Sequence, residues 1–194
     1  MVRVLSALPA RQPGYMDAYY YYNGAESLYR GQGFNESFIW NYLADPQGLP
    51  HPSHLYWMPL ASLLIYPFFL IFGASSYRVA QIPFILLSSL LPLITYHISR
   101  QMSSEDRYAL GAALLTVFSG FYTAYWVSPD NFTPFAVTAS LSLWLMGAGL
   151  SLNLKSDSER SNDLSHYYPF TRSDETCLRL HDRRRNGLWF FFLA

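Results

Sequence analysis

The sequence predicts an all-α fold, a polytopic transmembrane helical bundle with an extracytoplasmic loop that carries short interfacial helices. Only 13% of the 194 residues are charged, whereas soluble domains average about 25%. Asp, Glu, Lys and Arg are absent from 79–99, 108–129 and 131–154. Each stretch reaches the ~20 residues that a helix needs to cross a bilayer. A soluble chain of this length is too short to bury three such helices in its core, so the pattern indicates membrane spans.

The first region, 1–54, is expected to be an extracytoplasmic aromatic loop that contains Asp17. In "GYMDAYYYYNGAESLYRGQGF", Asp17 is a candidate N-cap of a helix running to about Tyr29, with Gly31 just beyond its end. The proline-rich segment 44–54 reads as loop.

The next region, 55–154, is expected to hold an apolar segment followed by three transmembrane helices. The segment 55–73 is interrupted by Pro59 and Pro67. It is either a kinked spanning helix or a helix that lies in the membrane interface. Its Trp- and Tyr-containing start favours the interface, where aromatic side chains concentrate.

Orientation follows from the basic residues. The segment 155–186 contains the run Arg183–Arg185 and is predicted to be a cytoplasmic basic loop, because short Lys/Arg-rich loops stay inside. Counting helices back from it places Asp130 outside, and Asp17 on the same side if 55–73 is interfacial. The last residues, 187–194, read as the start of a truncated transmembrane helix, and we expect the chain to be a fragment of a larger protein.

Some function classes are disfavoured by composition. The formal net charge is zero, so no nucleic-acid partner is expected. Cys177 is the single cysteine, which excludes an intramolecular disulfide framework and gives no metal or redox motif.

Acids and histidines near the predicted spans are the candidate functional residues. Asp17 and Asp130 can each be a helix cap, but at one membrane face they can also share a pocket and act as a base or bind a cation. Glu36 reads as a solvated loop acid or a metal ligand. His51 and His54, in "HPSH", are candidate metal ligands without a recognised ligand motif.

Aromatic and basic side chains complete the set. Tyr19 and the three tyrosines after it are membrane-interface anchors or part of a sugar site, because tyrosine offers a ring face and a hydroxyl. Arg78 either contacts a phosphate or extends from the bilayer to the interface.

The chain contains "PGYMDAYYYYNGAESLYRGQGF", then "PHPSHLYWMPL" and an apolar stretch ending in "FG". With these motifs, the region of about 11–154 resembles membrane glycosyltransferases of the C-type fold (GT-C). The protein-mannosyltransferase and aminoarabinose-transferase-like group, glycosyltransferase family 39, is the most similar. Asp17 matches the family's first acid and Asp130, in "SPDN", its second. Ala18 stands where the family has another acid beside the first, and His51 where some relatives have a glutamate.

The resemblance implies an inverting transfer of a sugar from a polyprenyl-phosphate donor to a lipid, glycan or protein acceptor. Asp17 would be the general base, and Asp130 would bind a metal or the acceptor. A divalent cation or an arginine would stabilise the departing phosphate. The expected location is a bacterial-type cytoplasmic (inner) membrane, as a multi-pass protein.

Two other interpretations remain open at this stage. The helices can belong to a non-catalytic membrane module, such as part of a transporter or an assembly subunit, with "GAALL" and "MGAGL" as packing surfaces. The chain can also be an inactive remnant of a transferase.

Overall fold

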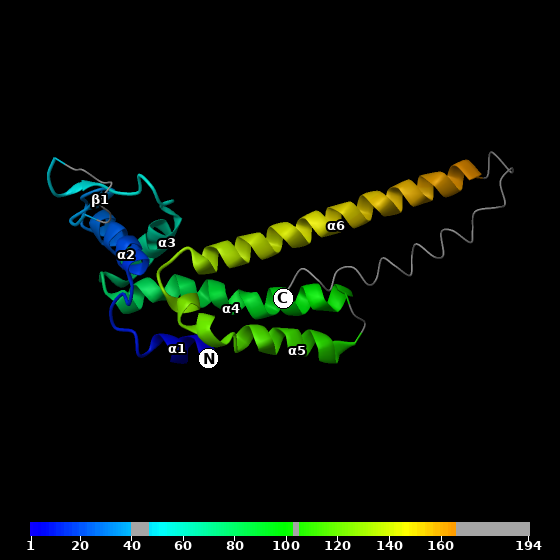
Figure 1. The fold of residues 1–194 in the computed structure, drawn as a ribbon, viewed down its shortest axis with the longest axis horizontal. Helices are drawn as coiled ribbons and strands as arrows, with labels where there is room; N and C mark the ends of the chain where they lie inside the picture. The colour runs from blue at the N-terminus through cyan, green and yellow to red at the C-terminus, as the bar shows by residue number, and fades with distance from the viewer. Residues whose placement is uncertain (40–46, 103–104, 166–194) are drawn as a thin grey trace. The chain divides into compact units, whose positions relative to one another are not determined.

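The computed structural model describes the backbone of residues 1–39, 47–102 and 105–165. Clustering divides the chain into two compact units, Met1–Leu145 and Met146–Ala194. Almost all of the regular structure is helical (Figure 1). The elements are α1 (Val2–Ala7), α2 (Met16–Tyr29), β1 (Asn35–Glu36), β2 (His51–Pro52), α3 (Leu60–Phe72), α4 (Tyr77–Met102), α5 (Asp106–Val117), the 3₁₀ helices η1 (Gly120–Thr123) and η2 (Tyr125–Val127), and α6 (Phe132–Ser165).

Two helices in the described part of the chain are long and apolar enough to cross a membrane. These are Tyr77–Met102 and the Phe132–Leu150 part of α6. At 1.5 Å per residue, the 26 residues of α4 span about 39 Å, more than the ~30 Å hydrocarbon core. α4 continues through Pro83 and Pro92, as the sequence prediction of a helix there requires.

The single helix predicted over 108–129 is corrected by the structure. α5 ends at Val117 after 12 residues, about 18 Å, and the chain continues in two 3₁₀ turns. Gly120 adopts a φ of +57°, a left-handed conformation that favours glycine and ends helical geometry. The Trp126 indole donates a hydrogen bond to the Ser119 hydroxyl at 2.7 Å, which stabilises the turn. Composition alone does not reveal this break.

α2 ends as predicted and begins differently. It ends at Tyr29, and Gly31 follows with a φ of +75°, which suits a helix C-terminus. The N-cap, however, is Tyr15, so Asp17 lies inside the first turn and makes no capping hydrogen bond. The N-cap interpretation of Asp17 is therefore wrong, and a carboxylate in the first turn instead interacts favourably with the helix dipole.

α3 forms the middle of the predicted apolar segment 55–73. It starts after Pro59, includes Pro67 and stops at Gly73, which has a φ of +61°. Its 13 residues reach about 20 Å, shorter than the hydrocarbon core.

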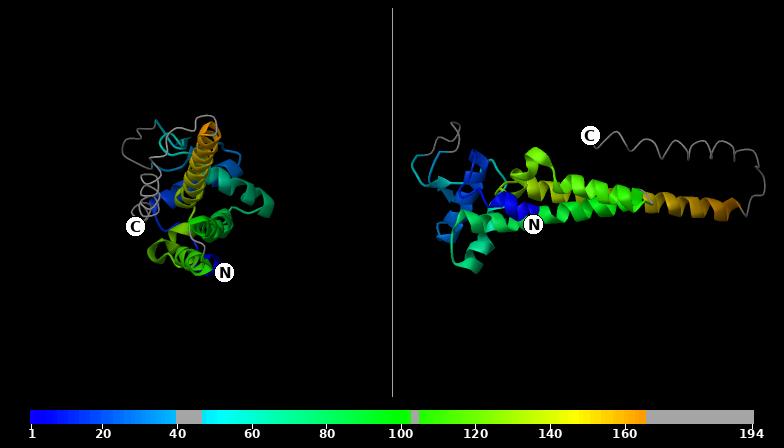
Figure 2. Two further views of the ribbon diagram at one scale, coloured as in Figure 1. Left: turned by 90° about the vertical axis from the view of Figure 1, so that its right-hand side faces the viewer. Right: turned by 90° about the horizontal axis from the view of Figure 1, so that it is seen from below.

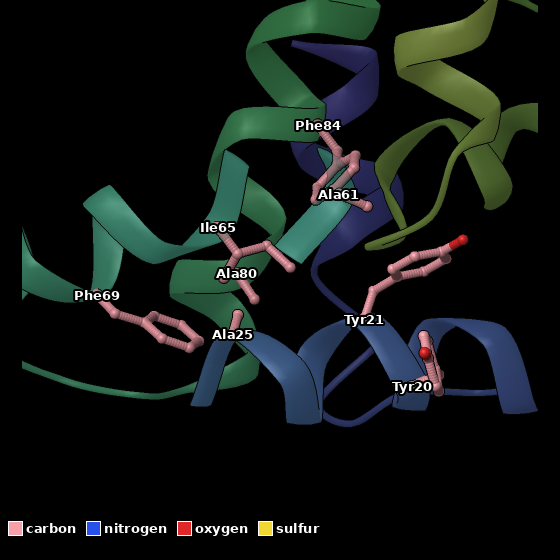
Figure 3. Packing of buried hydrophobic residues seen from close by; sticks show 8 residues of the cluster. All are labelled: Tyr20, Tyr21, Ala25, Ala61, Ile65, Phe69, Ala80 and Phe84. Atoms are coloured by element: carbon pink, nitrogen blue, oxygen red, sulfur yellow. The ribbon is translucent and has the colours of Figure 1, made fainter. Parts of the chain in front are cut away.

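The packed core lies where α2, α3 and α4 meet. Figure 3 shows its eight residues, which are Tyr20, Tyr21, Ala25, Ala61, Ile65, Phe69, Ala80 and Phe84. Alanines from all three helices are fully buried there, and small side chains let helix backbones approach closely. α4 also runs beside α5 (Figure 1 and Figure 2).

The C-terminal predictions fall mostly outside the described residues. α6 continues to Ser165, so the first part of the segment predicted as a cytoplasmic loop, 155–186, is helical. The rest of that segment and the predicted helix start at 187–194 lie outside the described residues. The two-residue strands β1 and β2 pair antiparallel, with Glu36 opposite His51, a small departure from the all-α prediction.

Candidate functional site

Asp17 lies in the first turn of α2. It follows the N-cap residue Tyr15, whose backbone is extended. Its side chain is partly exposed. Among the described residues, no hydrogen bond or ion pair involves its carboxylate. Asp17 is thus an acid with both oxygens available to an incoming group.

Asp130 lies two residues before α6 and has the opposite environment. The residue is only 5% exposed, and both carboxylate oxygens accept hydrogen bonds. The Tyr15 hydroxyl donates to Oδ2 at 2.6 Å, and the backbone N–H of Asn131 donates to Oδ1 at 2.5 Å. Because α6 starts at Phe132, Asp130 precedes the helix rather than capping it.

The fold brings these two acids, 113 positions apart in the chain, into electrostatic range. Burial raises the pKa of the Asp130 carboxyl, hydrogen bonds from Tyr15 and Asn131 oppose that rise, and the charge of Asp17 adds to it. The nearby Asp17 charge thus disfavours the charged form of Asp130.

Tyrosines surround the acids. Burial raises the pKa of the Tyr15 hydroxyl, and the Asp130 carboxylate raises it further. Burial also raises the pKa of Tyr21, with contributions from Asp130 and Asp17. The Tyr21 hydroxyl accepts a hydrogen bond from the Asn131 side chain, and the Ser128 hydroxyl opposes the rise in the Tyr15 pKa. These phenols therefore stay protonated and present hydroxyl groups.

Sequence reasoning named Tyr21 only as one of four tyrosines that anchor the chain at the interface or belong to a sugar site, and it missed Tyr15, Ser128 and Asn131. One signal was available for Tyr21, which follows Asp17 by four residues and so shares its face of α2. The other contacts join residues more than 100 positions apart, and no local pattern predicts such pairs.

In the described part of the chain, no hydrogen bond or ion pair joins Tyr19 or Arg78 to the acids. Tyr19 is exposed, and its ring packs edge-on against Phe38 with 5.3 Å between centroids. Arg78 is exposed near the start of α4, and within the described part of the chain no hydrogen bond or ion pair involves it.

A second polar cluster lies on the β1–β2 hairpin. His51 Nε2 is 3.2 Å from Glu36 Oε1, and both residues are buried. Burial raises the pKa of Glu36, and the nearby His51 opposes that rise. The solvated-loop interpretation of Glu36 is therefore wrong, because the hairpin holds it in a buried ion pair.

His51 is bonded on both sides of its ring. Nδ1 lies 3.1 Å from the Pro52 carbonyl oxygen, and Nε2 lies 3.2 Å from the Phe38 carbonyl oxygen as well as near Glu36. Both ring nitrogens are thus within hydrogen-bonding distance of oxygen atoms, which fixes the orientation of the ring.

His54 joins the hairpin to the core. Its φ of +60° is unusual for a residue other than glycine. Its backbone N–H donates to the Tyr20 hydroxyl, and its ring packs against Tyr20 and Phe34, with 5.1 Å between centroids in each pair. Burial lowers the pKa of His54, which a bond to the Trp57 carbonyl opposes.

A metal site is not assembled from these candidates. In residues 1–39, 47–102 and 105–165, no group of three or more His, Cys, Asp or Glu side chains is placed to hold a metal ion. Glu36 and His51 bond each other, and His54 faces aromatic rings.

Comparisons with protein-family models, with curated proteins and with solved structures find no match.

Proposed function

We propose that this chain is, or is part of, a membrane glycosyltransferase. It would transfer a sugar from a polyprenyl-phosphate donor to an acceptor hydroxyl, with inversion, at the extracytoplasmic face of a bacterial-type cytoplasmic membrane. The single observation that supports this most is that Tyr15 and Tyr21, on either side of Asp17, bond Asp130 and Asn131 beside two helices able to cross a bilayer.

Asp17 is the general base in this proposal. A base must come within hydrogen-bonding distance of the proton that it takes. Among the described residues, no hydrogen bond or ion pair occupies the Asp17 carboxylate. Asp17 accepts the proton of the acceptor hydroxyl as its oxygen bonds to the anomeric carbon. The bond from that carbon to the phosphate oxygen breaks, and the polyprenyl phosphate leaves with the electron pair.

Asp130 supplies fixed negative charge in this proposal. Both of its oxygens are already bonded by protein donors, so it suits the binding of a cation or of an acceptor hydroxyl more than proton exchange. The departing phosphate requires positive charge, and such electrostatic stabilisation is usually the largest contribution to catalysis. The exposed Arg78 and a divalent cation are the two proposed sources.

The proposal predicts that Asp17→Asn abolishes sugar transfer. The chain is reconstituted in liposomes with polyprenyl-phosphate mannose or polyprenyl-phosphate aminoarabinose carrying a labelled sugar, and transfer and release of polyprenyl phosphate are measured. Loss of a general base should reduce the rate by about 10²–10⁴-fold. Asparagine has nearly the same size as aspartate, so the thermal midpoint should change little.

Asp106→Asn is the matched control, because Asp106 is an exposed acid in the first turn of α5 that pairs with Arg100. It should retain full transfer. Transfer at the wild-type rate by Asp17→Asn would exclude Asp17 as the base. Failure of the wild-type chain to release polyprenyl phosphate from either donor would overturn the proposal that this chain is itself the transferase.

A further inference from the structure

The hydrogen bond between Tyr15 and Asp130 separates the roles of the two acids. Asp130 is 5% exposed and accepts one bond on each oxygen, whereas Asp17 is partly exposed. Of the two bonds, the one from Asn131 comes from the adjacent backbone. Only the Tyr15 bond ties Asp130 to α2, across 115 positions of sequence.

We propose that Tyr15 is a positioning residue, whose hydroxyl holds Asp130 as a fixed anion beside α2 and so leaves proton exchange to Asp17. This role rests on the proposed transferase function and assigns a second task within the same site. Tyr15 would act through Asp130 and would not itself react.

The chemistry of the contact supports this assignment. A hydroxyl that donates to an ionised carboxylate makes a bond roughly twice as strong as one that donates to a neutral acceptor. The Oη to Oδ2 distance of 2.6 Å lies in the 2.5–2.7 Å range typical of such charge-assisted bonds. The bond therefore favours the anion against the cost of burying it.

The groups that face Asp130 leave Tyr15 as the main side-chain donor that stabilises its negative charge. Asp17 and Tyr21 come from α2, Tyr77 from the start of α4, and Ser128 from the turn before Asp130. Asp17 repels the Asp130 charge, and the Ser128 hydroxyl opposes the rise in the Tyr15 pKa. No cation contributes to the pKa of Asp130 in the described part of the chain.

A packing role for Tyr15 is the alternative, because its ring lies 5.4 Å from that of Tyr125. Tyr15→Phe separates the two roles, since it keeps the ring and removes only the hydroxyl. Tyr22→Phe is the matched control. The Tyr22 hydroxyl donates to a neutral acceptor, the Ser75 carbonyl, at 2.7 Å.

The test measures the thermal midpoint of both variants and of the wild-type chain at about pH 4 and about pH 8, on either side of a raised Asp pKa. Removing the Tyr15 hydroxyl raises the Asp130 pKa further, so the anion costs more stability as pH rises. The loss caused by Tyr15→Phe should be roughly twice as large at the higher pH. The loss caused by Tyr22→Phe should be the same at both.

A double-mutant cycle completes the test, with Tyr15→Phe also measured in the Asp130→Asn background. There, Tyr15→Phe should cause the same loss at both pH values, because no charge remains to be stabilised. A pH-independent loss for Tyr15→Phe in the wild-type background would overturn the proposal, as would failure of that variant to fold even at the lower pH. These readouts need no sugar donor, so they stand apart from the result of the Asp17→Asn transfer assay.

Discussion

For single residues, the neighbouring atoms determine whether an acid is exposed or buried and whether a position can carry a side chain. Asp17 and Asp130 are the same amino acid near the same candidate spans, yet one is partly exposed and the other is buried with both oxygens bonded. The sequence identifies both as candidates because an acid beside an apolar stretch is unusual. Their different surroundings come from partners distant in the chain.

Position 24 in α2 requires a glycine, because neighbouring side chains leave no room for a Cβ atom. A Cβ there would lie 2.8 Å from His54 Nε2 and 2.9 Å from the Ser62 hydroxyl oxygen. Gly24→Ala should therefore lower the free energy of unfolding, since overpacking typically costs about 1–3 kcal/mol. This cost exceeds the gain in helix propensity of at most about 1 kcal/mol. Denaturant unfolding in detergent measures the change.

Gly111→Ala is the control for that prediction. Gly111 is also helical, and nothing lies within 4 Å of its added Cβ. This substitution should stabilise the chain by up to about 1 kcal/mol through helix propensity alone. Equal stabilisation by both substitutions would contradict the close packing of His54 on Gly24.

Among the helices and strands, the β1–β2 hairpin and α5 differ most from what the sequence predicts. The segment around Glu36 and His51 reads as loop because of its prolines and glycines, and the structure turns it into a short antiparallel pair with a buried ion pair. α5 reads as part of a long apolar helix, and the structure ends it at Val117. In the hairpin, a contact between two strands decides the outcome, whereas α5 ends beside a glycine with positive φ and a Trp126–Ser119 hydrogen bond.

His51→Asn should destabilise the hairpin strongly. The asparagine amide can still reach the Pro52 carbonyl, but the Glu36 carboxylate loses its partner. Breaking a buried pair on one side costs about 3–5 kcal/mol. Burial already raises the pKa of Glu36, so the folded state holds that proton more tightly than the unfolded state, and stability falls as pH rises. Losing His51 raises the pKa further and extends this fall to higher pH.

Thermal unfolding of His51→Asn across a pH series measures both effects. Arg30→Ala is the reference, because Arg30 and Glu26 form an exposed i,i+4 pair worth only about 0.3–0.5 kcal/mol. Adding Glu36→Gln to His51→Asn should recover part of the loss, since it removes the unpaired charge. A loss no larger than that of Arg30→Ala would show that the buried pair contributes little.

In the molecule as a whole, the helices that cross the bilayer determine whether Asp17 and Asp130 lie on the same side of the membrane. α4 and the first part of α6 are long and apolar enough to cross, whereas α3 and α5 are shorter than the hydrocarbon core. If only the longer helices span, then residues before α4 share one side, and the segment before α5 lies on the other.

Cysteine labelling tests this arrangement. In a Cys177→Ser background, Leu55→Cys and Ser76→Cys flank α3, and Glu105→Cys follows α4; all three positions are exposed. A membrane-impermeant maleimide applied to intact cells and to inverted vesicles should label positions 55 and 76 from one side and 105 from the other. Labelling of 55 and 76 from opposite sides would mean that α3 spans the bilayer.

Local chemistry was sufficient for the helical class, the end of α2 shortly before Gly31, and the length of α4. Each depends on residues within a few turns of one another: charge-free stretches, a glycine that tolerates positive φ, and apolar composition. Folding in three dimensions was needed to pair Tyr15 with Asp130, to bury Glu36 against His51, and to end the helix at Val117. Those outcomes depend on hydrogen bonds and burial between residues that composition and periodicity do not relate.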